Sequence, residues 1–129
     1  MAKVVIDTSA LITLLANRKT IWFLKNEFAL KHQIITSPYL IAELERVLKN
    51  KLKLSKSKVK SISSLYQSLS TVKQVGEIKR LTRDENDDPI LSLALEQKAE
   101  YLITFDKDFL VLNGIYSLKI IKPDNLDSL

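Results

Sequence analysis

Short apolar segments alternate with longer amphipathic ones along this chain, and the alternation restricts the folds open to it. Segments 3–7, 33–36, 101–104 and 118–121 are short and rich in Val, Ile and Leu, which is typical of buried β-strands. The segments between them carry apolar residues at helical spacing. Strands that alternate with helices predict an α/β fold, in which helices cover a mainly parallel sheet.

Residues that suit the N-cap position precede several expected helices. Ser9 is expected to cap the first helix, with Asp7 as the alternative. Ser37 stands before Pro38 and Asp88 before Pro89, and proline suits the first helical position. The helices are expected at 20–31, 38–49, 57–69 and 89–98, with a weak strand at 71–75, a helical turn at 108–112 and a tight turn at 113–114.

The length and the residue types exclude several classes of protein. A chain of 129 residues is expected to form one domain, residues 1–129. It has no Cys and one His, His32, which excludes disulfides, thiolate zinc sites and multi-histidine sites. No stretch approaches the apolar length of a membrane span, and Asp7 interrupts the apolar N-terminal run as no signal peptide would. We therefore expect a cytoplasmic protein without membrane contact.

The net charge of +5 is distributed unevenly. Residues 46–83 hold eleven Lys and Arg side chains against one acid, Glu77, whereas residues 84–129 hold ten acids against four lysines. A basic section of this kind indicates a polyanionic partner. The acidic section in the same small chain requires a separate explanation.

Carboxylates occur where the expected strands end. Asp7 ends the first strand, Glu43 lies on the helix after the second, and Asp106 and Asp108 follow the third. Asp87 and Asp88 open the helix that precedes that strand. Because the carboxyl ends of parallel strands meet at one sheet edge, we expect these groups to lie close together.

Each carboxylate also has a simpler interpretation. Asp7 suits a helix cap, and Asp106 and Asp108 suit an exposed loop. Glu43 borders an apolar helical stripe, where a carboxylate needs a partner. Asp88 is expected to cap the helix at Pro89, which leaves Asp87 for another role. As a group, however, carboxylates at one edge repel one another unless a divalent cation neutralises them. All-oxygen ligands favour Mg²⁺ or Mn²⁺.

Four motifs in order resemble the PIN domain family, and together they span most of the chain. They are IDTSAL at 6–11, SPYLIAEL at 37–44, DDPILSLA at 87–94 and LITFDKDF at 102–109. The resemblance implies a three-layer α/β/α fold with a central sheet. It also implies a Mg²⁺- or Mn²⁺-dependent ribonuclease similar to toxins of the VapC type, with a homodimer and an antitoxin protein as expected partners.

The resemblance also implies roles for individual residues. Asp7, Glu43, Asp87 and Asp106 match the family's acidic quartet, with Asp88 and Asp108 as alternative metal ligands. The hydroxyl positions beside the quartet match Thr8 or Ser9, and Thr104. Metal-dependent hydrolysis requires no side-chain nucleophile, and it would leave a 3′-hydroxyl and a 5′-phosphate.

The basic section supplies candidates for contact with the RNA backbone, and a solvated helix face is the simpler interpretation. These candidates are Lys49, Lys51, Lys53, Lys56, Lys58 and Lys60. Two other functions stay open. One is a PIN-fold module that binds RNA without cleaving it. The other is a receiver-like phospho-acceptor domain, which would require an acceptor Asp at the end of a middle strand.

Overall fold

The computed structural model contains a five-stranded sheet in the order β3-β2-β1-β4-β5, and every neighbouring pair is parallel. The structure describes residues 2–80, 87–110, 112, 114 and 117–129. The central strand is β1 (Ala2–Ile6), flanked by β2 (His32–Thr36) and β4 (Tyr101–Ile103). The edge strands are β3 (Ser70–Val72) and β5 (Lys119–Ile121). The prediction of a mainly parallel sheet is confirmed.

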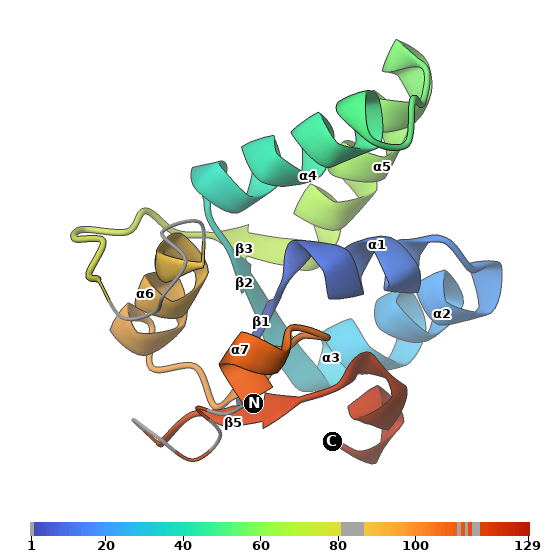
Figure 1. Cartoon of the computed structure of the whole chain (residues 1–129). Helices are drawn as coiled ribbons and strands as arrows, with labels where there is room; N and C mark the ends of the chain where they lie inside the picture. Colours follow the sequence, from blue (N-terminus) through green and yellow to red (C-terminus); the bar gives the residue numbers. More distant parts are fainter. Residues whose placement is uncertain (1, 81–86, 111, 113, 115–116) are drawn as a thin grey trace.

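Helices cover both faces of this sheet, because successive strand residues point to opposite sides. Val4 and Ile6 of β1 pack into one hydrophobic cluster, whereas Val5 packs into a second. The first cluster lies under α1 (Thr8–Leu15), α2 (Arg18–Phe23), η1 (Leu24–Phe28), α3 (Ala29–Lys31) and the 3₁₀ segment η3 (Pro123–Ser128). The second lies under α6 (Asp88–Glu96) and α7 (Lys107–Leu110). The result is the expected three-layer α/β/α arrangement (Figure 1).

A helical hairpin extends from one end of the sheet, formed by α4 (Pro38–Asn50) and α5 (Lys56–Leu69) (Figure 1). The Ser37 hydroxyl begins α4 by accepting a hydrogen bond from the Leu40 amide at 3.3 Å. Leu44 and Leu48 of α4 and Tyr66 of α5 are buried in the first cluster. Their burial anchors the hairpin to the rest of the fold.

Two helix starts differ from the predictions. The prediction that Ser9 caps α1 is wrong, because the helix begins at Thr8 and the alternative cap, Asp7, accepts a hydrogen bond from the Thr8 amide at 2.7 Å. The helix expected at 20–31 begins at Arg18 after Asn17, whose side chain accepts from two amides. It also contains a π-helical turn, η1, that the apolar spacing did not predict.

The remaining predicted elements agree to within a few residues, as is usual for element ends. Part of the turns expected at 108–112 and 113–114 lies outside the described residues. Within the described part of the chain, no helix is long and apolar enough to cross a bilayer. The cytoplasmic location and the one-domain organisation stay predictions.

Candidate active site

The predicted site residues lie at the carboxyl edge of the sheet, beside its central strand. From β1 the sheet continues through β2 to β3 on one side and through β4 to β5 on the other. Such a switch in strand order opens a crevice at the carboxyl ends of the strands. Asp7 follows β1, Asp106 follows β4 and Glu43 lies on α4, which follows β2.

A hollow of about 560 Å³ opens at this edge. It contains all four members of the predicted quartet, although they come from distant parts of the sequence. The hollow is lined by Asp7, Thr8, Ser9, Ile12, Glu43, Val47, Lys51, Asp87, Phe105 and Asp106. Among the described residues that line the hollow, four are carboxylates and one, Lys51, is a cation.

The Thr104 hydroxyl connects two of these carboxylates. It donates to Oδ2 of Asp7 at 2.8 Å and accepts from the Asp106 amide at 2.9 Å. Thr104 is fully buried, so its hydrogen bond to Asp7 forms away from bulk water, whereas the one from the Asp106 amide is partly buried. The other Asp7 oxygen, Oδ1, accepts from the Thr8 amide. Asp7 is thereby held in one orientation at the junction of β1 and α1.

Three carboxylates approach one another closely at the rim of the hollow. Single oxygens of Asp87, Asp106 and Asp108 all lie within 4.8 Å of one another. Oδ1 of Asp106 also accepts from the Asp108 amide at 2.9 Å, which orders the turn at the start of α7. Three negative charges at this spacing repel one another in the absence of a cation. The structure thus groups Asp108 with Asp87 and Asp106.

Asp88 points away from this group. The prediction that Asp88 caps α6 is wrong, because the helix begins at Asp88 and the N-cap position falls on Asp87. The Asp88 side chain is only 1% exposed, and its Oδ2 lies 3.4 Å from Nε of Arg80. Burial and the ion pair give Asp88 a structural role, and its place as an alternative metal ligand stays a prediction.

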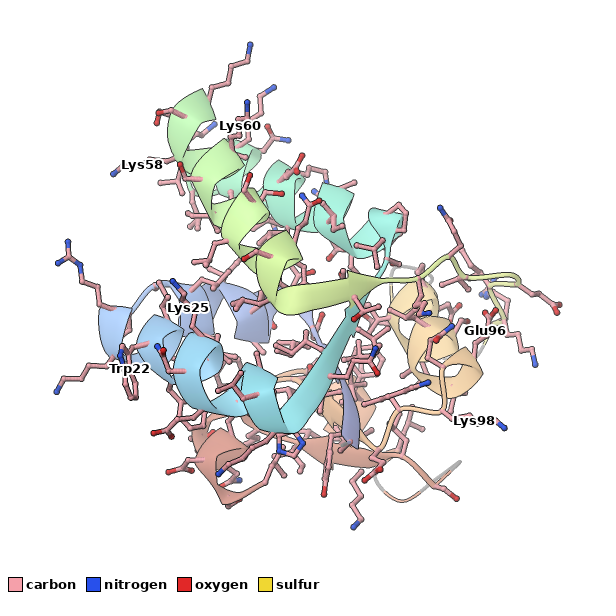
Figure 2. The ribbon with its side chains drawn as sticks, turned by 180° about the vertical axis from the view of Figure 1, so that it is seen from behind. Trp22, Lys25, Lys58, Lys60, Glu96 and Lys98 are labelled. Carbon is pink, nitrogen blue, oxygen red and sulfur yellow. The ribbon has the colours of Figure 1, made fainter. Side chains whose placement is uncertain are left out.

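The segment that carries Arg80 runs along α6 (Figure 2). Its attachment begins at Gly76, whose amide donates to the Glu96 carboxylate at 3.0 Å. It continues at Lys79, whose amide donates to the Ser92 hydroxyl at 3.0 Å. With the Arg80–Asp88 ion pair, these contacts fix the start of α6, where Asp87 lies. The sequence analysis did not single out Arg80, because only the three-dimensional structure shows that it pairs with Asp88.

The surroundings raise the pKa values of Asp7 and Glu43. Burial raises the pKa of Asp7, the hydrogen bonds from Thr104 and the Thr8 amide oppose this, and the charge of Asp106 adds to it. Burial also raises the pKa of Glu43, followed by the charge of Asp7. The Thr8 hydroxyl, Arg46 and Lys51 lower the pKa of Glu43 in part. Both acids therefore hold protons more readily than free carboxylates do.

Comparison with known proteins agrees with this arrangement. The family model of the PIN domain matches residues 3–108. The chain belongs to the PIN domain family. This PIN domain has no match among curated proteins.

Two solved structures share the fold. VapBC2 from Rickettsia felis, bound to a DNA fragment from its promoter, is similar with a TM-score of 0.67 and 20% identity, over 93% of this chain and 98% of the other. PAE2754 from Pyrobaculum aerophilum is similar with a TM-score of 0.56 and 17% identity, over 99% of this chain and 91% of the other. At these identities the likeness concerns the fold alone.

The six predicted RNA-binding lysines are separated in the PIN domain. Lys51 lines the acidic hollow. Lys49, Lys56 and Lys60 line a different hollow of about 680 Å³ between α4 and α5. Lys53 and Lys58 are exposed and line neither of these two hollows. Figure 2 shows Lys58 and Lys60 at the outer end of α5.

The turns of α4 explain this separation. Leu40, Leu44 and Leu48 form its buried stripe. Glu43, Val47 and Lys51 repeat every four residues and line the acidic hollow on one flank of that stripe, and Glu45 and Lys49 line the second hollow on the opposite flank. Side chains four positions apart share a helix face, so Lys51 is on the flank of Glu43.

Three more lining residues, Thr8, Ser9 and Phe105, can be compared with the predictions. Both predicted hydroxyl candidates at the start of α1 line the hollow, with Thr8 buried and Ser9 exposed. Phe105 lines it as well, and sequence reasoning missed this residue. A signal was present, since Phe105 is a large apolar residue placed directly between Thr104 and Asp106 in an otherwise polar turn.

Proposed function

We propose that this PIN domain is a Mg²⁺- or Mn²⁺-dependent ribonuclease, and that it is the toxin component of a toxin–antitoxin system. The observation that carries the proposal is the convergence of Asp7, Glu43, Asp87 and Asp106 on one hollow. Membership of the PIN domain family, whose members are generally nucleases, supports it. The basic section between residues 46 and 83 supplies the charge that a polyanionic substrate requires.

The donor atoms of the site fit a hard divalent cation. Asp87, Asp106 and Asp108 offer three carboxylate oxygens within 4.8 Å of one another. Mg²⁺ and Mn²⁺ prefer such oxygen ligands, whereas the chain has no Cys and one His to offer softer metals. We therefore propose that these three residues bind the cation. Asp7 and Glu43 add negative charge to the same hollow.

Different residues of the site would have different roles in phosphodiester hydrolysis. When bound, the divalent cation would neutralise the scissile phosphate and lower the pKa of a water molecule. Glu43, with its raised pKa, is suited to accept the proton that the attacking water loses. Hydrogen bonds from the Thr8 amide and the Thr104 hydroxyl fix the orientation of Asp7, so its carboxylate holds a fixed position in the hollow. Lys51 attracts the RNA backbone to the hollow.

The test is cleavage of end-labelled RNA with Mg²⁺, Mn²⁺ or EDTA. We expect cleavage with either metal, products with a 3′-hydroxyl and a 5′-phosphate, and no cleavage in EDTA. Asp106→Asn should lower the rate at least about a hundredfold, because even residues that only support a metal site contribute ten- to hundredfold. Asp124→Asn, at an exposed position of η3, is the matched control and should cleave normally.

Other outcomes would select another function or mechanism. Tight RNA binding without cleavage would favour the non-catalytic PIN-fold module. A 2′,3′-cyclic phosphate end would contradict the hydrolytic mechanism. The receiver-like alternative finds no support, because β3 lies at the sheet edge and is followed by Lys73 rather than by an acceptor Asp.

An antitoxin protein and a second copy of the chain are the proposed protein partners. The similar fold of VapBC2, solved with a DNA fragment from its promoter, supports the first. If a small gene lies beside that of this chain, co-expression with its product should give a complex in which RNA cleavage is inhibited. Light scattering on the purified chain should give twice the monomer mass, and a monomer at all concentrations would contradict the proposed dimer.

A further inference from the structure

The exposure of Phe105 has no explanation in the packing of the core. Its side chain is 43% exposed, whereas the preceding residue, Thr104, is fully buried. Single exposed apolar residues are common on protein surfaces and mean little by themselves. Phe105, however, lines the hollow that contains the acidic quartet, and it directly precedes the proposed metal ligand Asp106. The aromatic ring is therefore one position in the sequence from a proposed ligand of the catalytic metal.

The backbone on both sides of Phe105 is fixed. The Thr104 amide donates to the Ile121 carbonyl of β5 at 3.0 Å. The Asp106 amide donates to the Thr104 hydroxyl at 2.9 Å. The ring is therefore carried by an ordered turn, and little conformational freedom remains to be lost when a ligand contacts it.

The lining of the hollow has separate acidic, apolar and cationic groups. The carboxylates supply oxygen ligands, while Ile12, Val47 and Phe105 supply apolar surface and Lys51 supplies a positive charge. A nucleotide is complementary to the last two groups, because its phosphate is attracted to cations and its base packs on an apolar or aromatic surface. We propose that Phe105 stacks on a base adjacent to the scissile phosphate and is the base-positioning residue of this nuclease. This inference rests on the proposed function.

A stacking role makes a quantitative prediction that a structural role does not. Stacking of one base on an aromatic side chain strengthens binding substantially and tolerates any base, because every base has a π-face. We expect Phe105→Leu to weaken RNA binding about tenfold, and Phe105→Trp to restore it. In cleavage, the loss should appear mainly in KM, because the ring holds the substrate without touching the reacting atoms.

The experiment measures affinity for a short unstructured RNA, labelled at one end, with Mn²⁺ present. The protein carries Asp87→Asn so that the RNA stays intact. Phe105→Leu is compared with Trp22→Leu, which removes another exposed aromatic ring, 58% exposed on α2 and outside the hollow (Figure 2). A second set of RNAs carries a single abasic site at successive positions. Thermal melting and Mn²⁺ titration verify that each variant folds and binds Mn²⁺ as the Asp87→Asn parent does.

The expected result has two parts. Trp22→Leu binds like the parent protein, and Phe105→Leu binds about tenfold more weakly. One abasic position weakens the parent by the same factor and has no further effect on Phe105→Leu, because both changes remove the same contact. Equal affinity of Phe105→Leu and Trp22→Leu, or additive effects at every abasic position, would overturn the proposal.

The outcomes also separate this inference from the proposed function. Cleavage by the wild type with no effect of Phe105→Leu on binding or KM would overturn the stacking role and leave the nuclease in place. Loss of affinity in Phe105→Leu, with no cleavage by the wild type, would retain the stacking role in a protein that only binds RNA. No RNA binding by the parent protein, together with no RNA binding and no cleavage by the wild type, would overturn both.

Discussion

The Thr104 hydroxyl donates a hydrogen bond to Asp7 across 97 positions of the sequence. The two residues end neighbouring parallel strands, β4 and β1, so the register of the sheet brings them together. The same hydroxyl accepts from the Asp106 amide. One buried side chain thus sets the relative positions of two members of the acidic quartet.

Thr104→Val should therefore impair the site more than the fold. Valine has nearly the same shape but neither donates to Asp7 nor accepts from the Asp106 amide. We expect RNA cleavage and Mn²⁺ affinity to fall ten- to hundredfold, as for other residues that support metal ligands. The partly buried Asp106 amide would lose its acceptor, so the variant should also lose about 1 kcal/mol of stability.

Thr104→Ser is the matched control, because it keeps the hydroxyl and loses only a methyl group. It should retain most of the cleavage activity. Equal activity of the valine and serine variants, measured as kcat/KM on one RNA, would show that the hydroxyl does not organise the site.

We expect Asp7 to reduce the stability of the metal-free protein at neutral pH. Burial raises the pKa of Asp7, so the folded state binds a proton more tightly than the unfolded chain does. The free energy of unfolding then falls as pH rises from the unfolded pKa to the folded one, and the loss persists above it. Asp7→Asn removes this charge while keeping the side-chain shape.

We expect Asp7→Asn to raise the melting temperature in EDTA at neutral pH. The difference should vanish near about pH 3, below the ordinary pKa of an aspartate, where both folded and unfolded wild-type chains are protonated. Thermal unfolding across this pH range is the measurement. A lower melting temperature for the variant at neutral pH would mean that the hydrogen bonds of the Asp7 carboxylate stabilise the fold by more than its buried charge destabilises it.

Lys51 should contribute to RNA binding more than the other lysines of the basic section. It lines the acidic hollow, whereas Lys58 is exposed on α5 and lines neither hollow. Lys51→Ala is expected to lower the slope of log affinity against log salt by about 0.7, the value for one phosphate contact on a single strand. Lys58→Ala should change it less. Equal slopes for the two variants would contradict a special place for Lys51.

Ser37→Ala tests the start of the helix that carries Glu43. The Ser37 hydroxyl accepts from the Leu40 amide, and loss of such a cap typically costs about 1 kcal/mol. We expect a slightly lower midpoint of urea unfolding with an unchanged slope. Ser37→Thr keeps a hydroxyl at this buried cap and should retain more stability than Ser37→Ala does.

The order of strands and helices was predictable because each element is marked locally. Short runs of Val and Ile mark β1 and β2, and Ser37 with Pro38 marks the start of α4. The convergence of Asp7 and Asp106 at one edge followed from the rule for parallel strands. These predictions needed no knowledge of which side chains touch.

Tertiary contacts account for the differences. The ion pair between Asp88 and Arg80 depends on how the chain after β3 runs along α6, which no local pattern reveals. The sequence analysis treated the lysines as one group, because the hollow that each one lines depends on how α4 and α5 pack on the rest of the fold. The π-helical turn η1 likewise has no local signal among its apolar residues.

Glu43 and Leu44 are neighbours on α4, and this restricts the insertions and deletions that the chain can tolerate before them. Glu43 lines the hollow and Leu44 is fully buried in the core, about 100° further around the helix. Deletion of one residue between Ser37 and Glu43 would place Leu44 in the hollow and Glu45 in the core. Such a change would unfold the protein as well as remove an acid, so selection for folding alone protects the helical register of the site.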